Sequence, residues 1–249
     1  CWKHILKMER TKMFYNKIRK LVRDPKLFFS DMAANQARKL SKLHLKKQDG
    51  HYDYTVISAV YNVSAFLDDY FKGFIHQHLK FKKHIRLVLV DDGSTDSSAD
   101  IIKKWQKKYP NNITYIFQEN AGQSAARNNG LQHVATEWVT FIDPDDFVDA
   151  DYFYNLDTFL YQHNDKDVKM VGCNIIMFYE AKNQYKDVHP LAYKFKKGNQ
   201  LVLLSDMEKE IQLSASTAFF RSDIIASKNV FFDARVKPNF EDAHFVARY

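Results

Sequence analysis

The chain has 249 residues, of which 45% are hydrophobic and 15% aromatic, which is enough to form the core of one large domain. Its 7 glycines and 5 prolines exclude a collagen-like or low-complexity chain, and its two cysteines, Cys1 and Cys173, exclude a disulfide framework. No apolar run approaches the ~18 residues that span a bilayer, and the first residues lack the apolar core of a signal peptide, so we expect a protein of the reducing cytoplasm.

Charge is distributed unevenly along the chain. Residues 1–47 hold 14 Lys and Arg against 3 Asp and Glu, a balance of +11, so the remaining residues, with 23 against 27, carry −4. Apolar residues at helical spacing between Phe14 and Val22 predict an amphipathic helix. We therefore predict a basic helical extension or linker over residues 1–50.

Three interpretations of this extension are open. The first is a solvated helical pair that packs on the main domain or links it to another. The second is a basic amphipathic anchor on the anionic inner face of the cell membrane. The third, contact with nucleic acid, is not expected, because no recognised nucleic-acid-binding module accompanies the basic residues.

From Tyr54 onward, short β-branched runs alternate with helical patterns. Strands are predicted over 54–62, 85–90, 113–118, 137–142 and 230–233, and helices over 64–80, 97–108 and 123–134. Strands separated by helices of this length indicate βαβ units and a parallel sheet, in which ligands bind at the carboxyl ends of the strands.

Acidic residues crowd behind the fourth predicted strand, in FIDPDDF (141–147). A divalent cation offsets the repulsion between crowded carboxylates. Asp143 and Asp145 offer the one or two carboxylates by which Mg²⁺ or Mn²⁺ is held beside substrate phosphates. The alternative is a capping turn for a helix that begins near Phe147.

A second acidic cluster, VDDGSTD (90–96), ends the second predicted strand. Gly93 suits a tight turn, and Ser94, Thr95 or Asp96 suits a helix cap. Such a junction gives no reason for the two acids before it. A haloacid-dehalogenase-type phosphatase needs Asp-x-Asp-x-Thr/Val, which this motif does not match, and a dinucleotide-binding dehydrogenase needs a G-x-G-x-x-G that the sequence lacks.

Five motifs follow one another at natural spacings. They are AVYN (59–62), VDDGSTD (90–96), ENAGQSAARNNG (119–130), FIDPDD (141–146) and the stretch 216–245 with its Glu-Asp pair. Together they resemble family 2 glycosyltransferases of the GT-A fold, over about residues 54–249. The resemblance implies an α/β domain, a mostly parallel sheet flanked by helices, over 51–249. Residues 51–146 would form its nucleotide-binding half and 147–249 its acceptor-side half.

The resemblance also implies roles for individual residues. It implies base and ribose contacts for Ala59, Tyr61, Asn62, Asp91 and Asp92, and diphosphate contacts for Asn120, Gly122 and Arg127. The Asp-x-Asp consists of Asp143 and Asp145, and the Glu-Asp pair consists of Glu241 and Asp242. Asp145 would be the principal ligand of Mn²⁺ or Mg²⁺, with Asp143 near the ribose or the metal. Glu241 would contact the nucleotide sugar, and Asp242 would be the catalytic base. Ala59 departs from the family, in which Pro or Thr is commoner.

On this basis we expect an inverting, metal-dependent glycosyltransferase of the hexosyltransferase type. It would move a sugar from a nucleotide donor, UDP-linked by family habit, to a glycan acceptor during synthesis of a bacterial surface polysaccharide such as a capsule. The alternatives are a sugar-phosphate or nucleotidyl transferase of the same fold, or a catalytically silent nucleotide-sugar-binding module. The chain ends seven residues after Asp242, where family members continue with helices that close the acceptor side. We therefore expect a fragment that forms one domain of a larger polymerase.

The remaining reactive side chains are interpreted structurally. His76, His78 and His84 are expected at the surface or at helix ends, and Cys173 as a small buried residue without a catalytic partner. His244 could contact the diphosphate or the metal, or it could have a simple packing role.

Overall fold

The computed structural model describes residues 47–164, 167–173, 177–179, 184–186, 201–203, 206, 214–236 and 240–249. The chain divides into two units, residues 1–46 and 47–249, and every described residue belongs to the second. The predicted basic extension therefore lies almost wholly outside the described residues. Within the described part of the chain, no helix is both long and apolar enough to cross a membrane.

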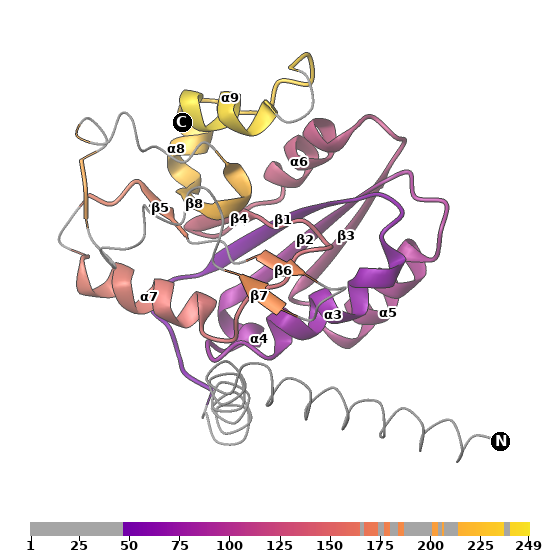
Figure 1. The fold of residues 1–249 in the computed structure, drawn as a ribbon, viewed down its shortest axis with the longest axis horizontal. Coiled ribbons are helices and arrows are strands. Elements are labelled where there is room, and N and C mark those ends of the chain that lie inside the picture. The colour runs from indigo at the N-terminus through magenta and orange to yellow at the C-terminus, as the bar shows by residue number, and fades with distance from the viewer. Residues whose placement is uncertain are drawn as a thin grey trace, which may run out of the picture. The chain divides into compact units, whose positions relative to one another are not determined.

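A mixed sheet is the centre of the fold (Figure 1). In the described residues its strands are β1 (Tyr54–Val60), β2 (Ile85–Asp92), β3 (Ile113–Gln118), β4 (Trp138–Phe141), β5 (Met170–Gly172) and β8 (Ala218–Arg221), in the order β3-β2-β1-β4-β8-β5. The first four are parallel, and β8 runs antiparallel between β4 and β5. Two short strands, β6 (Met177–Tyr179) and β7 (Gln184–Lys186), pair with each other. The predicted mostly parallel α/β sheet is confirmed.

Helices cover both faces of the sheet (Figure 1). They are α3 (Ser64–Ile75), α4 (Phe81–His84), α5 (Ser98–Lys108), α6 (Gln123–Leu131), α7 (Tyr152–Gln162), α8 (Ser222–Ser227) and α9 (Glu241–Arg248), with a 3-10 turn, η4, at Ala215–Thr217. Side chains alternate along β2, so Leu87 and Leu89 pack in one core with α3, α5 and α7. Val88 and Val90 pack in a second core with α6, α8 and α9.

Several predicted elements differ in extent from those of the structure, and tertiary or backbone features explain two of the differences. The first strand ends at Val60 because Asn62 adopts a left-handed φ of 52°, which breaks the extended backbone. The helix predicted over 64–80 ends at Ile75. There the buried side chain of Gln77 donates to Asp149 O (2.6 Å) and accepts from Phe153 N–H (3.2 Å), tying the chain to the start of α7.

Two further predictions fail because of tertiary contacts. No strand forms at 230–233: the Asn128 side chain bonds both the N–H (2.8 Å) and the C=O (2.7 Å) of Phe232, which takes those groups from any neighbouring strand. No helix begins near Phe147 either, because α7 starts only at Tyr152. The capping-turn interpretation of FIDPDDF is therefore wrong.

Two of the three histidines are buried rather than exposed. His78 pairs with Asp151, and His84 Nδ1 lies 3.0 Å from Asp53 Oδ1. The backbone N–H of Gly50 donates to His84 Nε2 (3.0 Å), so the segment before β1 supplies partners for this ring. His84 does end a helix, α4, as expected, but the sequence pattern did not predict the burial of either ring, because their partners come from distant segments.

Candidate active site

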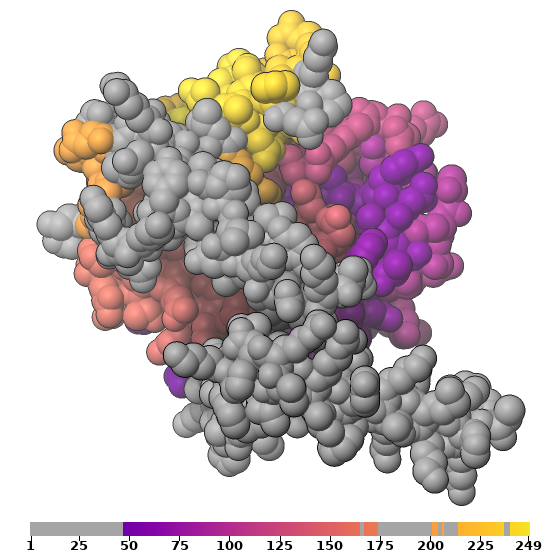
Figure 2. Space-filling model, viewed as in Figure 1, coloured from indigo at the N-terminus to yellow at the C-terminus, as the bar shows by residue number. Residues whose placement is uncertain are grey.

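The two acidic clusters meet at one edge of the sheet. Asp91 and Asp92 end β2, Asp143 follows β4, and β1 lies between these strands. Helices α6 and α9 lie side by side in Figure 1, and their surfaces adjoin on the face seen in Figure 2. Parallel strands end at a common edge, so the fold brings these carboxylates together with the residues of α6 and α9.

Asp91 and Asp92 are buried and hold the neighbouring loops. Asp91 accepts from Ser94 N–H (2.9 Å) and from the Tyr115 hydroxyl (2.8 Å). Burial and this carboxylate raise the pKa of Tyr115 well above its usual range, so the phenol stays a donor. The carboxylate of Asp92 accepts three bonds, from the Gln118 amide (2.7 Å) and from the N–H groups of Ala121 and Gly122 (2.8 Å each).

Other predicted nucleotide-binding residues shape the same loops. Asn62 accepts from Thr95 N–H (2.8 Å) and Asp96 N–H (3.2 Å), which fixes the GSTD turn against the end of β1. Asn120 donates to Asp92 O (2.9 Å). Gly93, with a φ of 77°, approaches Asn120 so closely that an added Cβ would lie 3.0 Å from its backbone nitrogen.

The residues at the mouth of this region differ in exposure. Ala59 is half-buried in β1, whereas 52% of Tyr61 is exposed just beyond the strand. Gly122 takes a φ of 89° directly before α6. These positions are consistent with nucleotide contacts, and their predicted roles stay predictions.

Arg127 joins the donor-side and acceptor-side residues. Its side chain is only 3% exposed; Nη2 lies 3.0 Å from Asp143 Oδ1, and Nη1 lies 2.7 Å from Asp242 Oδ1. Its guanidinium carbon lies 5.2 Å from the ring centre of Phe232 and 6.0 Å from that of Phe141. One guanidinium thus spans the predicted metal ligand and the predicted base.

Asp242 lies in the first turn of α9 and is held on both oxygens. While Oδ1 accepts from Arg127, Oδ2 accepts from Ala215 N–H (3.0 Å) and Ser214 Oγ (3.3 Å). Glu241 is buried beside it, and its Oε2 has no hydrogen-bond partner among the described residues. Within the same described part of the chain, the Nδ1 of His244, one turn further along α9, has none either. Buried polar atoms of this kind are commonly satisfied by water or a ligand.

The Asp-x-Asp lies in a tight turn. Asp146 N–H donates to Asp143 O (3.0 Å), with Pro144 between them and Asp145 exposed. Loss of hydration, together with Asp143 and Asp145, raises the pKa of Asp146 to about 6. This turn therefore concentrates negative charge.

The donor set of this turn fits a substrate-bridged ion. Among the described residues, no three His, Cys, Asp or Glu side chains are placed to hold a metal by themselves. Mg²⁺ and Mn²⁺ favour oxygen ligands, and one or two carboxylates suffice when substrate phosphates complete the coordination. Asp143 and Asp145 are such carboxylates.

Sequence reasoning missed several residues that organise the site. Gln123 donates to Asp143 Oδ1 (3.1 Å) one helical turn before Arg127, so helical spacing could have predicted it. Gln118 reaches Asp92 and Asn129 from the end of β3. Ser214 and Ala215 are 27 or more residues from Asp242, and no local pattern indicates that they contact it.

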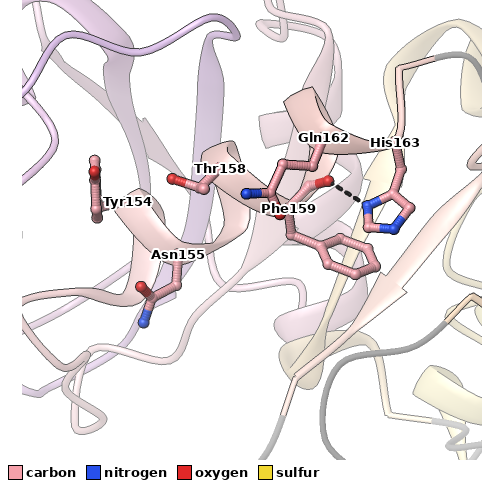
Figure 3. A pocket seen from close by; sticks show the side chains of 6 residues that line it. All are labelled: Tyr154, Asn155, Thr158, Phe159, Gln162 and His163. Atoms are coloured by element: carbon pink, nitrogen blue, oxygen red, sulfur yellow. Dashed lines mark hydrogen bonds between the residues drawn. The ribbon is translucent and has the colours of Figure 1, made fainter.

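A hollow of about 400 Å³ lies elsewhere, along α7 (Figure 3). Its described lining residues all belong to α7 or directly follow it: Tyr154, Asn155, Thr158, Phe159, Gln162 and His163. His163 Nδ1 bonds Phe159 O (2.8 Å), and none of these side chains is a carboxylate or a lysine or arginine. The hollow therefore does not extend the site described above.

Comparison with known sequences gives the family. The profile described as "Glycosyl transferase family 2" matches residues 55–226, more than half of the chain. The minor teichoic acid biosynthesis protein GgaB of Bacillus subtilis is 35% identical over 206 residues, which are 81% of this chain and 21% of that protein. GgaA, from the same organism and likewise a minor teichoic acid biosynthesis protein, is 31% identical over 77% of this chain and 42% of its own length. The chain thus spans less than half of either relative.

Solved structures share the fold. Residues 1–349 of TarS from S. aureus superpose with a TM-score of 0.62 at 23% identity, covering 79% of this chain and 55% of that one. The mannosyltransferase PcManGT of Pyrobaculum calidifontis, solved with GDP-Man and Mn²⁺, gives a TM-score of 0.55 at 18% identity, over 87% of this chain and 58% of that one. At these identities the likeness shows the fold alone, and that fold is GT-A. The chain belongs to glycosyl transferase family 2.

Proposed function

We propose that this chain is the catalytic domain of an inverting glycosyltransferase that uses a UDP-linked sugar and a divalent cation. The observation that carries the proposal is the Arg127 bridge, because it joins Asp143 of the Asp-x-Asp to Asp242, which lies 115 residues beyond Arg127 in the sequence. Residues predicted separately for the donor and for the base thus share one site. TarS has been solved with UDP and with UDP-GlcNAc, which favours uridine over other bases.

The proposed mechanism assigns one task to each group. Asp242 removes the proton of the acceptor hydroxyl as that oxygen attacks the anomeric carbon from the face opposite the leaving diphosphate, which inverts the centre. A cation held by Asp145 and Asp143 would supply positive charge to the leaving diphosphate. Arg127 and the N-terminal turn of α6 add fixed positive potential on the same side.

The acceptor and the setting are inferred from relatives. Both B. subtilis relatives carry teichoic acid biosynthesis in their names, so we infer a phosphate-containing surface polymer as the acceptor rather than a protein or a nucleic acid. Since the chain spans 21% and 42% of those proteins, we infer that it works as one domain of a larger enzyme. Residues 1–47 would then link it to another domain or to the membrane face.

Calorimetry tests the donor site. UDP, GDP and CDP are titrated with and without Mn²⁺ into the wild-type chain and into Asp145→Ala. We expect Mn²⁺-dependent binding of UDP that is lost in Asp145→Ala. Failure of every nucleotide to bind a folded wild-type chain would contradict the proposal.

Turnover tests the base. At saturating Mn²⁺, Asp242→Asn should keep UDP binding but lower transfer or hydrolysis of the UDP-sugar by about 10²–10⁴-fold, because it removes the proton acceptor. Equal rates in both proteins would exclude Asp242 as the base. UDP-sugar binding without turnover in either would favour the catalytically silent binding module.

A further inference from the structure

The guanidinium group of Arg127 pairs with two carboxylates at once. Nη2 donates to Asp143 Oδ1 and Nη1 to Asp242 Oδ1, and the side chain is 97% buried. Asp143 and Asp242 are themselves 32% and 20% exposed, so solvent reaches the carboxylates but hardly the guanidinium. A buried guanidinium stays charged and is costly to bury without such partners, so the bridge stabilises Arg127 as much as it holds the carboxylates.

The position of Arg127 is fixed by what packs around it. Its guanidinium lies over Phe232, and Phe232 stacks on Phe245 of α9 with ring centres 4.2 Å apart. The backbone of Phe232 is held by both ends of the Asn128 amide. The side chain of Arg127 is therefore held in place by packing against Phe232. Its two carboxylate partners differ in how many other donors hold them.

Asp242 is also held by donors other than Arg127, whereas Asp143 is also a predicted ligand of the cation. Ala215 N–H and Ser214 Oγ hold Asp242 Oδ2 independently of Arg127. Asp143 Oδ1 accepts from Arg127 and Gln123, and the same carboxylate belongs to the Asp-x-Asp turn, in which three aspartates lie within four positions. A carboxylate oxygen cannot serve a guanidinium and a divalent cation equally, since the two positive charges repel.

We propose that Arg127 couples the two functions of the site: it competes with the cation for Asp143 and positions Asp242. When Asp143 serves the cation, Arg127 keeps only its bond to Asp242, so loading of the donor side leaves the whole guanidinium charge beside the base. This inference rests on the proposed function, because it takes Asp143 as a cation ligand and Asp242 as the base. Arg127 is then a positioning residue for Asp242.

A double-mutant cycle on Mn²⁺ affinity tests the coupling. The wild-type chain, Arg127→Gln, Asp242→Asn and the double variant are titrated with Mn²⁺, alone and with saturating UDP, and free Mn²⁺ is followed by electron paramagnetic resonance. Arg127→Gln should bind Mn²⁺ about fivefold or more tightly, because its competitor is gone. Asp242→Asn should bind more weakly, because Arg127 then turns fully to Asp143. In the Arg127→Gln background the Asp242→Asn change should have no effect.

Two controls separate coupling from bulk charge and from misfolding. Arg235→Gln removes one positive charge from a side chain that is 88% exposed and should leave Mn²⁺ affinity unchanged. Arg127→Lys keeps the charge but cannot span both carboxylates, so it should also abolish the effect of Asp242→Asn. It replaces Arg127→Gln if that variant does not unfold cooperatively.

The outcomes are distinct. If the two substitutions act independently, multiplying in the double variant, Arg127 does not couple the carboxylates and the proposal is overturned. If no form binds Mn²⁺ in either condition, Arg127 has no competitor and the proposal falls together with the cation site. Because the cycle reads Mn²⁺ binding rather than turnover, coupling can fail while UDP-sugar is still consumed, and the proposed function can fail while coupling is found.

Discussion

At the scale of single residues, buried charged side chains hold the loops around the site through hydrogen bonds. Asp92 is 3% exposed and its carboxylate accepts three hydrogen bonds, so its negative charge is offset by donors from the loop before α6. If such a carboxylate is replaced, its buried donors lose their acceptor, and a buried polar group left without a hydrogen bond typically costs about 1–3 kcal/mol. The resemblance assigns Asp92 to the nucleotide, and the structure adds that it also shapes the loop that would carry the diphosphate.

Asp92→Asn should disturb this loop. An amide has one accepting oxygen, and its NH₂ group would face backbone N–H groups, so the chain should lose about 1–3 kcal/mol of unfolding free energy. UDP affinity should fall about tenfold, or about 1.4 kcal/mol. Urea unfolding and calorimetry check these changes.

Asp100→Asn makes the same chemical change on the exposed face of α5 and should alter stability by less than about 0.5 kcal/mol. If a folded Asp92→Asn chain binds UDP as tightly as wild type, neither Asp92 nor its loop contributes to the donor site.

At the scale of elements, α6 is the connection between the two halves. Its neighbouring residues point to different partners: Arg127 to Asp242, Asn128 to Phe232 and Asn129 to Gln118. Gly130 lets the helix lie directly on β1, since an added Cβ would be 2.4 Å from Ile57 Cγ2. The helix itself was predicted from local spacing, ending three residues late, but its partners were not.

Cys173, which directly follows β5, can report on the contact between β5 and α7. Its N–H bonds Thr217 O (2.7 Å), and loss of hydration raises the pKa of the thiol to about 11, although Tyr152 works against this. Because the folded-state pKa is raised, the neutral thiol contributes stability below about pH 9 that is lost as the pH rises through 11.

In a Cys1→Ser chain, iodoacetamide at pH 8 should alkylate folded Cys173 roughly 100-fold more slowly than the urea-unfolded chain, since two pKa units change the thiolate fraction by that factor. Tyr152→Phe removes the hydroxyl that lowers the pKa and should slow labelling further. Equally fast labelling of folded and unfolded chains would show that β5 does not pack on α7 as described.

At the scale of the whole described unit, the segment before β1 is part of the fold. The buried carboxylate of Asp157 on α7 accepts from the N–H groups of His51 and Tyr52 (3.0 Å each) and from the Tyr54 hydroxyl (3.1 Å). The first residues of the predicted domain thus bind the start of the sheet to α7.

Gly50→Ala should weaken this attachment. An added Cβ would lie 2.6 Å from Leu79 Cδ1 and 2.8 Å from Asp157 Oδ2, so either the leucine or the carboxylate must shift. We expect a loss of about 1–3 kcal/mol in the free energy of unfolding, measured by urea denaturation. Gly172→Ala is the matched control, because an added Cβ there meets nothing within 4 Å. Equal stability of the two variants would contradict the importance of this attachment.

The sequence by itself determined the α/β alternation, the parallel strands and the family. Strand and helix periodicity and the turn chemistry of motifs such as VDDGSTD act between near neighbours, so they can be read from the chain. Only the tertiary structure decided that Arg127 bridges Asp143 and Asp242, that His78 and His84 are buried beside carboxylates, and that residues 230–233 form no strand. Those outcomes depend on partners from 16 up to 115 residues away, and hydrogen bonds and charge pairs at that distance leave no local pattern.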